Sequence, residues 1–260
     1  MISVIITFRG TDSYRIENLY AVQAHLQQSF PSWEIIIIEQ DKKSSLDLDR
    51  FLSAPRHLLV QNPGAFNKSW GINVGYRLST EETLLITDAD MLVSKQDLKR
   101  STEAIHQGLD VVRPFRRLID MTKQETSTYL ESGTLPERPE ADRGFDRNYL
   151  GERICLAGGL FFIKRTFFET IGGFDERFSG WGGEDDAFSI KAEAMTSRSA
   201  IARHAFAWHL WHPRTIPQDH SDYHDNTRLL SEYQHLDNAG IGKLIERVSE
   251  MKGLINKFEN

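Results

Sequence analysis

The sequence predicts an α/β protein with a mostly parallel central sheet and helices on both of its faces. Short apolar runs rich in β-branched residues alternate with segments of helical periodicity between residues 2 and 114. Such runs are typical of parallel strands that are buried on both faces. With 260 residues, of which 40% are hydrophobic and 26% charged, the chain can bury the core of one large domain, or of one domain with a small appendage.

The first half of the chain supplies the elements of this sheet in order. Strands are expected at residues 2–8, 34–39, 57–61, 83–87 and 110–114, and helical stretches separate them. The helix expected at residues 94–107 begins with Ser94 and Asp97, a pattern similar to a capping box. Ligands bind at the carboxyl ends of parallel strands, so residues that directly follow the strands are the first candidates for a site.

The second half of the chain is less regular. Residues 120–153 are polar and rich in charged side chains, so we expect a long surface excursion there. A strand at 156–164, a helix at 165–171, a glycine-rich turn at 172–183, a helix opening at Glu184 and a strand-like segment at 201–211 should follow. A stripe of apolar residues indicates a terminal helix: Ile241, Leu244, Ile245, Val248, Met251, Ile255 and Phe258. We expect this helix to pack on the sheet domain, and a dimer or partner surface stays open as the alternative.

Composition excludes several classes of protein. A formal net charge of -6 gives no basic field for a phosphate polymer, so nucleic acid is not an expected partner. The single cysteine, Cys155, cannot form an intramolecular disulfide. Apolar runs are far shorter than the ~20 residues that span a bilayer, and the first residues carry no signal-peptide pattern. We therefore expect a cytoplasmic protein without a transmembrane segment, and leave open a peripheral association with the inner membrane face.

Two carboxylates follow the fourth expected strand directly, in Asp88-Ala89-Asp90. Alternate positions at the end of a strand let one or both carboxylates reach a divalent cation that bridges phosphate oxygens. Two aspartates with this spacing also occur by chance in solvated turns, so the motif alone does not decide between the two interpretations. Its position at the end of a buried strand favours the metal site.

A second acidic cluster follows a glycine-rich turn in residues 180–186, GWGGEDD. The glycines permit positive φ and close approach of the backbone, and Trp181 offers a flat apolar face. Acids in the first turn of a helix also serve as simple caps that complement the helix dipole. Because three consecutive carboxylates repel each other and an exposed tryptophan is costly, we favour an acid cluster that faces a ligand.

Two histidines, His209 and His212, lie on a segment that should return near these acids. Isolated histidines are mostly structural or surface residues, so this pair needs the aspartates nearby to act as ligands. Mixed coordination by Asp and His would suit Mn²⁺ or a similar divalent ion better than Ca²⁺. Motifs of other chemistries are absent from the sequence, including the P-loop, GxSxG, HExxH and cysteine-based zinc spacings.

Several segments resemble, in the same order, glycosyltransferases of the GT-A fold. The resemblance is to the β-1,4-galactosyltransferase type, the related polypeptide N-acetylgalactosaminyltransferases and the bacterial chondroitin-polymerising enzymes. It rests on IITFR at residues 5–9, FNK at 66–68 with INVG at 72–75, Asp88-Ala89-Asp90 as the DxD motif, Gly158-Gly159 as the donor-side glycine pair, and WGGED at 181–185. It covers about residues 2–214, and the combination is more specific than any one motif.

The resemblance implies a metal site that holds Mn²⁺ or Mg²⁺. Asp90 would ligate the metal, with Asp88 close by. His212 would be the ligand from the later strand, and His209 falls where the galactosyltransferase type carries a second, weaker ligand. The choice between the two histidines stays open.

The resemblance also implies the residues that act on the substrates. Asp185 would be the general base that accepts the proton of the attacking hydroxyl, and Glu184 would bind hydroxyls of the donor or acceptor. Residues implied in binding the UDP-sugar donor are Thr7, Phe8, Arg9, Glu39, Phe66, Asn67, Lys68, Asp88, Gly159 and Trp181. Arg9 and Lys68 are the candidates for contacts to uridine or phosphate, and Trp181 is the apolar platform for a sugar.

The activity implied is metal-dependent transfer of a hexose or N-acetylhexosamine from a UDP-sugar to a hydroxyl of a glycan or glycoconjugate acceptor, with inversion at the anomeric carbon. A retaining transferase and a non-catalytic donor-binding subunit of a polysaccharide polymerase stay open as alternatives, and the acids Glu184 and Asp185 argue against the second. A nucleotidyltransferase would leave WGGED unexplained. We divide the chain into a GT-A catalytic domain at residues 1–214 and a C-terminal helical extension at 215–260, packed on or next to it.

Overall fold

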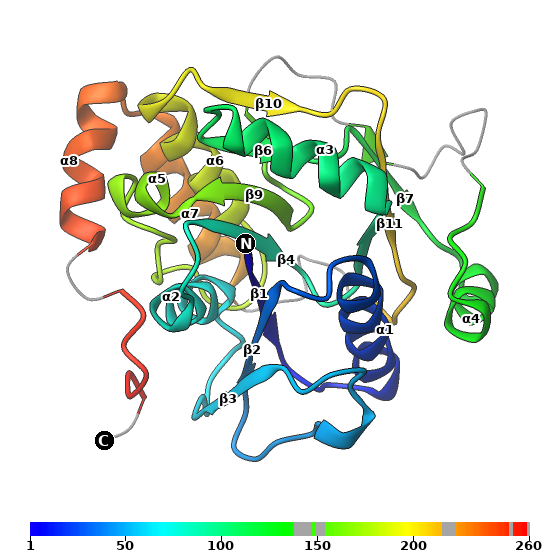
Figure 1. Ribbon diagram of the computed structural model, residues 1–260. Helices are drawn as coiled ribbons and strands as arrows, with labels where there is room; N and C mark the ends of the chain where they lie inside the picture. The colour runs from blue at the N-terminus through cyan, green and yellow to red at the C-terminus, as the bar shows by residue number, and fades with distance from the viewer. Residues whose placement is uncertain (138–146, 149–153, 215–221, 250–251, 259–260) are drawn as a thin grey trace.

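A seven-stranded sheet lies at the centre of the part of the chain that the computed structural model describes, residues 1–137, 147–148, 154–214, 222–249 and 252–258 (Figure 1). Its strands, in spatial order, are β10 (Ser199–Ile201), β6 (Val111–Arg113), β9 (Leu160–Lys164), β4 (Thr83–Thr87), β1 (Ser3–Phe8), β2 (Glu34–Gln40) and β3 (Arg56–Val60). All neighbours pair in parallel except β9, which is antiparallel to both β4 and β6. The predicted α/β class with a mostly parallel sheet is confirmed.

Helices cover both faces of this sheet. The described α-helices are α1 (Ser13–Ser29), α2 (Lys68–Leu78), α3 (Lys95–His106), α4 (Lys123–Ser132), α5 (Arg165–Thr170), α6 (Glu184–Met195), α7 (Tyr223–Gln234) and α8 (Asn238–Ser249). Helices α1 and α3 lie on one face, and α2, α5 and α6 on the other. Strand β1 shows the division, because Val4 and Ile6 pack in the core that α1 and α3 cover, whereas Ile5 between them packs in the core under α2, α5 and α6. Alternate side chains along β1 therefore contribute to two different cores.

A second, smaller sheet brings the segment with His209 and His212 close to Asp90. Its strands, in spatial order, are β5 (Met91–Val93), β11 (Phe206–His209), β7 (Arg117–Asp120) and β8 (Arg147–Asn148). Strand β11 is antiparallel to β5 with His209 opposite Met91, and parallel to β7 with His209 opposite Asp120. His209, the last residue of β11, and His212, three residues later, return to Asp90 as predicted, but by way of a separate sheet that we did not predict.

The surface excursion predicted at residues 120–153 is wrong for its first part. Helix α4 begins there with a full capping box between Thr122 and Glu125, and Tyr129 is only 4% exposed. The ring of Tyr129 lies beside His25 of α1. We missed this helix because its buried face consists of one threonine and one tyrosine, Thr126 and Tyr129, and lacks the aliphatic stripe that usually marks an amphipathic helix. Residues 138–146 and 149–153 lie outside the described part.

Two strands predicted in the second half are shorter than expected. The strand expected at 156–164 begins at Leu160, because Gly158 and Gly159 adopt positive φ values of 93° and 62° before it. The segment expected at 201–211 divides between β10, in the large sheet, and β11, in the small one. Its apolar residues therefore serve both sheets.

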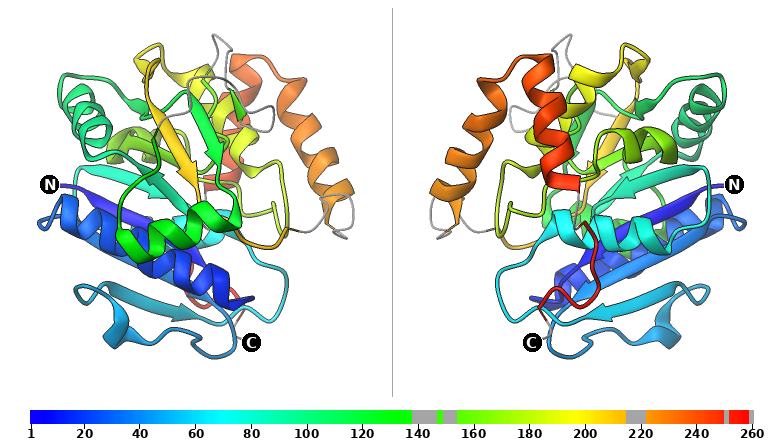
Figure 2. Two further views of the ribbon diagram at one scale, coloured as in Figure 1. Left: turned by 90° about the vertical axis from the view of Figure 1, so that its right-hand side faces the viewer. Right: turned by 90° about the vertical axis from the view of Figure 1, so that its left-hand side faces the viewer.

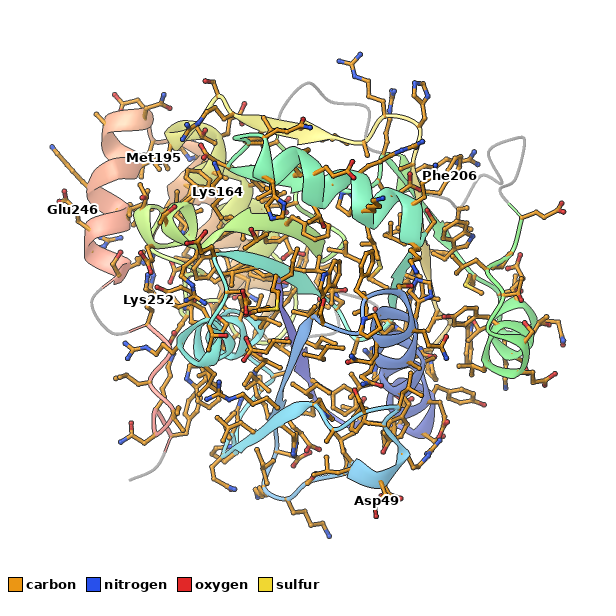
Figure 3. All side chains as sticks on the ribbon, viewed as in Figure 1. Asp49, Lys164, Met195, Phe206, Glu246 and Lys252 are labelled. Carbon is orange, nitrogen blue, oxygen red and sulfur yellow. The ribbon has the colours of Figure 1, made fainter. Side chains whose placement is uncertain are left out.

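Helices α7 and α8 lie side by side at one edge of the molecule (Figure 2). Tyr233 of α7, with Ile241, Leu244 and Ile245 of α8, joins the core under α6, while Glu246 of α8 points away from the protein (Figure 3). We did not predict α7. The division of the chain at residues 214 and 215 stays a prediction. None of the described helices is long and apolar enough to cross a membrane.

The terminal helix is shorter than its apolar stripe suggested. Helix α8 ends at Ser249, Met251 lies outside the described residues, and Gly253 takes a φ of 69° that no helix allows. Ile255 and Phe258 follow this break and are 43% and 37% exposed. The Phe258 ring nevertheless contacts the buried ring of Trp70 edge-on, so the last described residues pack on α2 without being helical.

Candidate active site

The carboxylates of Asp88 and Asp90 follow β4 and point into two different groups of side chains. The backbone N–H of Asp88 donates to the carbonyl of Gly159 (2.7 Å), which holds the end of β4 against the start of β9. The Asp88 carboxylate lies 3.0 Å from the Lys68 ammonium, and the Asp90 carboxylate lies beside two histidines. One DxD motif therefore contributes to two adjacent clusters.

The first cluster, the Asp90–His209–His212 triad, is buried. Its potential ligand atoms all lie within 4.8 Å of one another. Nε2 of His212 is 3.3 Å from Oδ2 of Asp90, and Nε2 of His209 is 3.5 Å from Oδ1. Burial alone would raise the pKa of Asp90, but the two histidines outweigh it and hold the pKa well below its usual range. Asp90 is therefore a carboxylate ready to hold a cation.

The other ring nitrogens distinguish the two histidines. Nδ1 of His212 lies 2.8 Å from the carbonyl of Pro213, which can only accept, so Nδ1 carries the hydrogen and the Nε2 lone pair faces Asp90. Nδ1 of His209 lies 2.8 Å from the Arg214 guanidinium, which can only donate. In a neutral His209 the hydrogen is then on Nε2. In this arrangement, His212 is oriented as the stronger ligand, whereas the hydrogen on Nε2 of His209 would have to leave before that nitrogen could bind a metal.

The second cluster, the Lys68 cluster, is built from Lys68 and three carboxylates. The Lys68 ammonium lies 3.0 Å from Asp88, 3.0 Å from Asp185 and 3.8 Å from Glu184. Burial alone would lower the pKa of Lys68, but the carboxylates raise it well above its ordinary value. Lys68, predicted to contact uridine or phosphate, here balances the charge of the acids.

Asp185 is the member of the Lys68 cluster with a free oxygen. Oδ2 accepts a bond from Lys68, while Oδ1 is buried and meets no hydrogen-bond partner within the described residues. Burial raises the pKa of Asp185 to about 7, against the lowering effect of Lys68 and with the support of Glu184. The sequence left the direction of this pKa open, because the helix N-terminus and the crowding of acids act in opposite senses.

A glycine-rich turn delivers Asp185 to this cluster. Gly182 and Gly183 adopt φ values of 93° and 90° immediately before α6, a conformation that other residues rarely take. The N–H of Gly180 donates to the carbonyl of Phe66 (2.8 Å), so the FNK and WGGED segments are neighbours. Trp181 is 48% exposed beside them.

Side chains predicted to bind the donor near β1 and α2 mostly contact the protein itself. The Arg9 guanidinium donates to the carbonyls of Gln40, Asn62 and Gly64. Thr7 and Phe8 are buried, and Phe8 lies in the core on the α1 side. Asn67 caps α2 and donates to the carbonyl of Glu176. These residues shape the loops around the site, and their contact with a donor stays a prediction.

Glu39, also predicted to bind the donor, is fully buried at the end of β2. Its carboxylate accepts bonds from Ser44 and Ser45 and lies 2.9 Å from Nε2 of His57. Burial alone would raise its pKa, but these partners lower it to about 2. The contacts assign Glu39 to anchoring the loop after β2, and a role in donor binding stays a prediction.

Sequence reasoning missed two charged residues beside the triad. Asp120 lies 3.4 Å from Nδ1 of His209, and Arg214 forms an ion pair with Asp120. We read Asp120 as the first residue of a polar excursion. It is the last residue of β7, preceded by Leu118 and Ile119 in the same way as Leu85, Ile86 and Thr87 precede Asp88. That apolar run before an aspartate was the available signal.

Comparison with known families decides where the chain belongs. The sequence model of glycosyl transferase family 2 matches residues 3–172, and a model described as the N-terminal domain of galactosyltransferase matches residues 144–210. The chain belongs to glycosyl transferase family 2. Both DxD aspartates and Gly159 lie in the first matched segment, and the WGGED acids and His209 lie in the second.

Individual relatives of this family 2 glycosyltransferase match part of the chain. Human chondroitin sulfate N-acetylgalactosaminyltransferase 2 is 27% identical over 168 residues, 61% of this chain and 29% of the relative. Human polypeptide N-acetylgalactosaminyltransferase 14 is 22% identical over 227 residues, 76% of this chain and 39% of the relative. The chain thus spans well under half the length of these relatives.

Solved structures show the same fold. GalNAc-T7, crystallised with UDP, GalNAc and Mn²⁺, gives a TM-score of 0.58 at 15% identity and covers 100% of this chain and 56% of its own. TarS of S. aureus gives 0.56 at 17% identity, with 92% of this chain and 41% of its own covered. These likenesses establish the GT-A fold that the sequence predicted.

Proposed function

We propose that this family 2 glycosyltransferase moves a hexose or N-acetylhexosamine from a UDP-sugar to a hydroxyl of a glycan or glycoconjugate acceptor, with a divalent cation and with inversion at the anomeric carbon. The observation that carries the proposal is the pair of adjacent clusters at the end of β4. One presents a carboxylate and two imidazoles within 4.8 Å, and the other a buried carboxylate with an unpartnered oxygen, judged on the described residues. Together they offer a cation site and a base.

The donor set of the triad supports a metal such as Mn²⁺ or Mg²⁺. Asp90 is ionised, and His212 directs its Nε2 lone pair at the same space, with Nδ1 fixed by the carbonyl of Pro213. A mixed Asp and His set suits Mn²⁺ or a similar divalent ion better than Ca²⁺, and the solved structure of GalNAc-T7 contains Mn²⁺ with UDP. When bound, the cation would offset the negative charge that develops on the leaving diphosphate. We assign Asp90 and His212 as the principal ligands and His209 as a supporting one.

Asp185 is proposed as the general base. A base near neutrality works best when its pKa lies near the working pH, and burial raises the pKa of Asp185 to about 7. Lys68 holds Oδ2, and the unpartnered Oδ1 is free to accept the proton of an acceptor hydroxyl. Glu184 lies in the same cluster, where it would hold a sugar hydroxyl.

We retain the cytoplasm as the proposed location of the protein.

The anomeric configuration of the first sugar released tests inversion. Incubation of the protein with Mg²⁺ and each UDP-sugar, followed by proton NMR within the first minutes, should show the β-anomer of the freed sugar before mutarotation mixes the two forms. Initial release of the α-anomer would establish a retaining transferase and remove Asp185 from the role of base.

The dependence of turnover on pH should follow Asp185. Because the base accepts a proton only when ionised, kcat/KM for donor cleavage should rise as the pH increases through about 7. The change Glu184→Gln removes a charge that raises this pKa, so the rising limb should move to lower pH. The change Lys68→Met removes a charge that lowers the pKa, so the limb should move to higher pH. A limb that stays in place in both variants contradicts the assignment.

Gly159 should be required for the position of Asp88. A Cβ at Gly159 would lie 1.9 Å from Oδ2 of Asp88, so Gly159→Ala must displace the carboxylate from its contact with Lys68. Gly133→Ala is the matched control, because Gly133 has a similar φ of 67° with no atom within 4 Å of its Cβ. Both variants should lose roughly 1–2 kcal/mol of stability from backbone strain.

Release of UDP separates the two glycine variants. Only Gly159→Ala should lose donor cleavage, which is measured as the release of UDP. Chemical denaturation of each variant measures its loss of stability. Equal losses of cleavage in both variants would show that strain alone is responsible and that Asp88 does not need its present position.

A further inference from the structure

The first turn of α7 is fastened to the glycine-rich turn that carries Trp181. The side-chain amide of Asn226 donates to the carbonyls of Ser179 (2.8 Å) and Trp181 (3.0 Å), and Asn226 is only 5% exposed. A Cβ at Gly180 would lie 2.3 Å from a carboxylate oxygen of Asp222, the residue before α7. The backbone around Trp181 and the start of α7 therefore form one packed unit.

This unit presents aromatic rings next to the acids. Trp181 is 48% exposed, three residues before Glu184, and the ring of Tyr223 lies 6.1 Å from the Trp181 ring with 33° between their planes. The ring of His224 lies a further 5.6 Å from that of Tyr223. Large exposed aromatic rings in a monomer commonly mark a binding surface, and the flat apolar face of a pyranose ring suits such a surface.

We propose that Tyr223 determines acceptor specificity, because it extends the sugar platform expected at Trp181 into a larger aromatic surface that binds a pyranose ring of the acceptor. Trp181, which the resemblance placed among the donor-binding residues, then contacts the acceptor. The inference rests on the proposed function and deepens it. Trp181 lies three residues before Glu184 and four before Asp185, so a sugar stacked on it would be held near the base that must receive the acceptor proton. Residues 222–226 lie outside both matched family segments, so neither family model accounts for this part of the surface.

Binding of simple sugars tests the proposal without requiring turnover. The probes are the methyl β-glycosides of glucose, galactose, N-acetylglucosamine and N-acetylgalactosamine, and the measurement is saturation-transfer NMR on the full chain with UDP and Mg²⁺. We expect at least one glycoside to bind the unchanged protein. Tyr223→Ala should weaken that binding roughly tenfold, and Tyr223→Phe, which keeps the ring, should bind within about twofold of the unchanged protein.

Two controls separate a lost contact from a damaged helix. Arg228 is an exposed residue of the same helix that forms an ion pair with Asp225. The variant Arg228→Ala should bind the glycoside normally. Thermal melting of each variant shows whether α7 is intact. If Tyr223→Ala melts early, Tyr223→Leu, which keeps an apolar side chain without the ring, replaces it in the binding measurement.

The outcomes distinguish this inference from the proposed function. Cleavage of a UDP-sugar together with glycoside binding that Tyr223→Ala leaves unchanged overturns the acceptor surface alone. The same holds if no glycoside binds the unchanged protein while a donor is cleaved. Glycoside binding that depends on Tyr223, in a protein that neither cleaves a donor nor binds UDP with Mn²⁺, supports the surface and overturns the transferase.

Discussion

Replacement of Asp185 by asparagine should abolish transfer and leave the binding of UDP and of the metal intact. Asparagine keeps the shape of the side chain and its contact distance to Lys68, but it cannot accept the proton of an acceptor hydroxyl. A positioned base contributes about 10²- to 10⁴-fold to a rate, so kcat should fall by that amount. The binding constants for UDP and Mn²⁺, measured by calorimetry, should change little, because the triad is built from other residues.

The neighbouring acid provides the matched control for this experiment. Asp186 is exposed on the same turn of α6. The ion pairs of Lys68 are with Asp88, Glu184 and Asp185, and not with Asp186. Asp186→Asn should therefore keep transfer near the unchanged level. Normal turnover in Asp185→Asn, or an equal loss in both variants, would remove Asp185 from the role of base.

Loss of Asp90 should have the second large effect, on the metal. Asp90→Ala removes the only carboxylate of the triad and leaves two imidazoles, so the affinity for Mn²⁺ should fall by more than about 100-fold and donor cleavage should be lost at micromolar Mn²⁺. His212→Ala should cause a comparable loss, because the carbonyl of Pro213 orients its Nε2 towards Asp90. Millimolar Mn²⁺ should restore part of the activity of the His212 variant.

The two other histidine variants test whether the orientation of the rings matters. His209→Ala should weaken metal binding less than His212→Ala, because Arg214 donates to Nδ1 of His209 and leaves the hydrogen on Nε2. His106→Ala removes an exposed histidine on α3 and should change nothing. A larger loss in His209→Ala than in His212→Ala would reverse the assignment of the principal ligand.

Much of the fold could be predicted because its strands are short apolar runs with clear ends. The run Thr83–Thr87 is fully buried and ends directly before Asp88, and the end of that strand is where the two clusters form. The small sheet could not be predicted in the same way. Its strand β5 has three residues, Met91–Val93, and its pairing with β11 joins segments more than 100 residues apart, which local periodicity does not record.

The candidate site could be predicted as a set of residues but not as an arrangement. Position at strand ends selected Asp88 and Asp90, and the glycine-rich turn selected Glu184 and Asp185. The sequence did not show that Lys68 would lie between Asp88 and Asp185, because α2 and α6 meet only through tertiary packing. The pKa of Asp185 depends on the same packing, since burial and the Lys68 charge have opposite effects on it.

The most direct test of the central claim is the release of UDP from a panel of UDP-glucose, UDP-galactose, UDP-N-acetylglucosamine and UDP-N-acetylgalactosamine, with Mn²⁺ and with a chelator. Slow hydrolysis of a donor requires no knowledge of the acceptor. We expect at least one donor to be cleaved with Mn²⁺, no cleavage with the chelator, and no cleavage by Asp90→Ala. Cleavage that persists with the chelator, or a protein that neither cleaves any donor nor binds UDP with Mn²⁺ by calorimetry, would contradict the account.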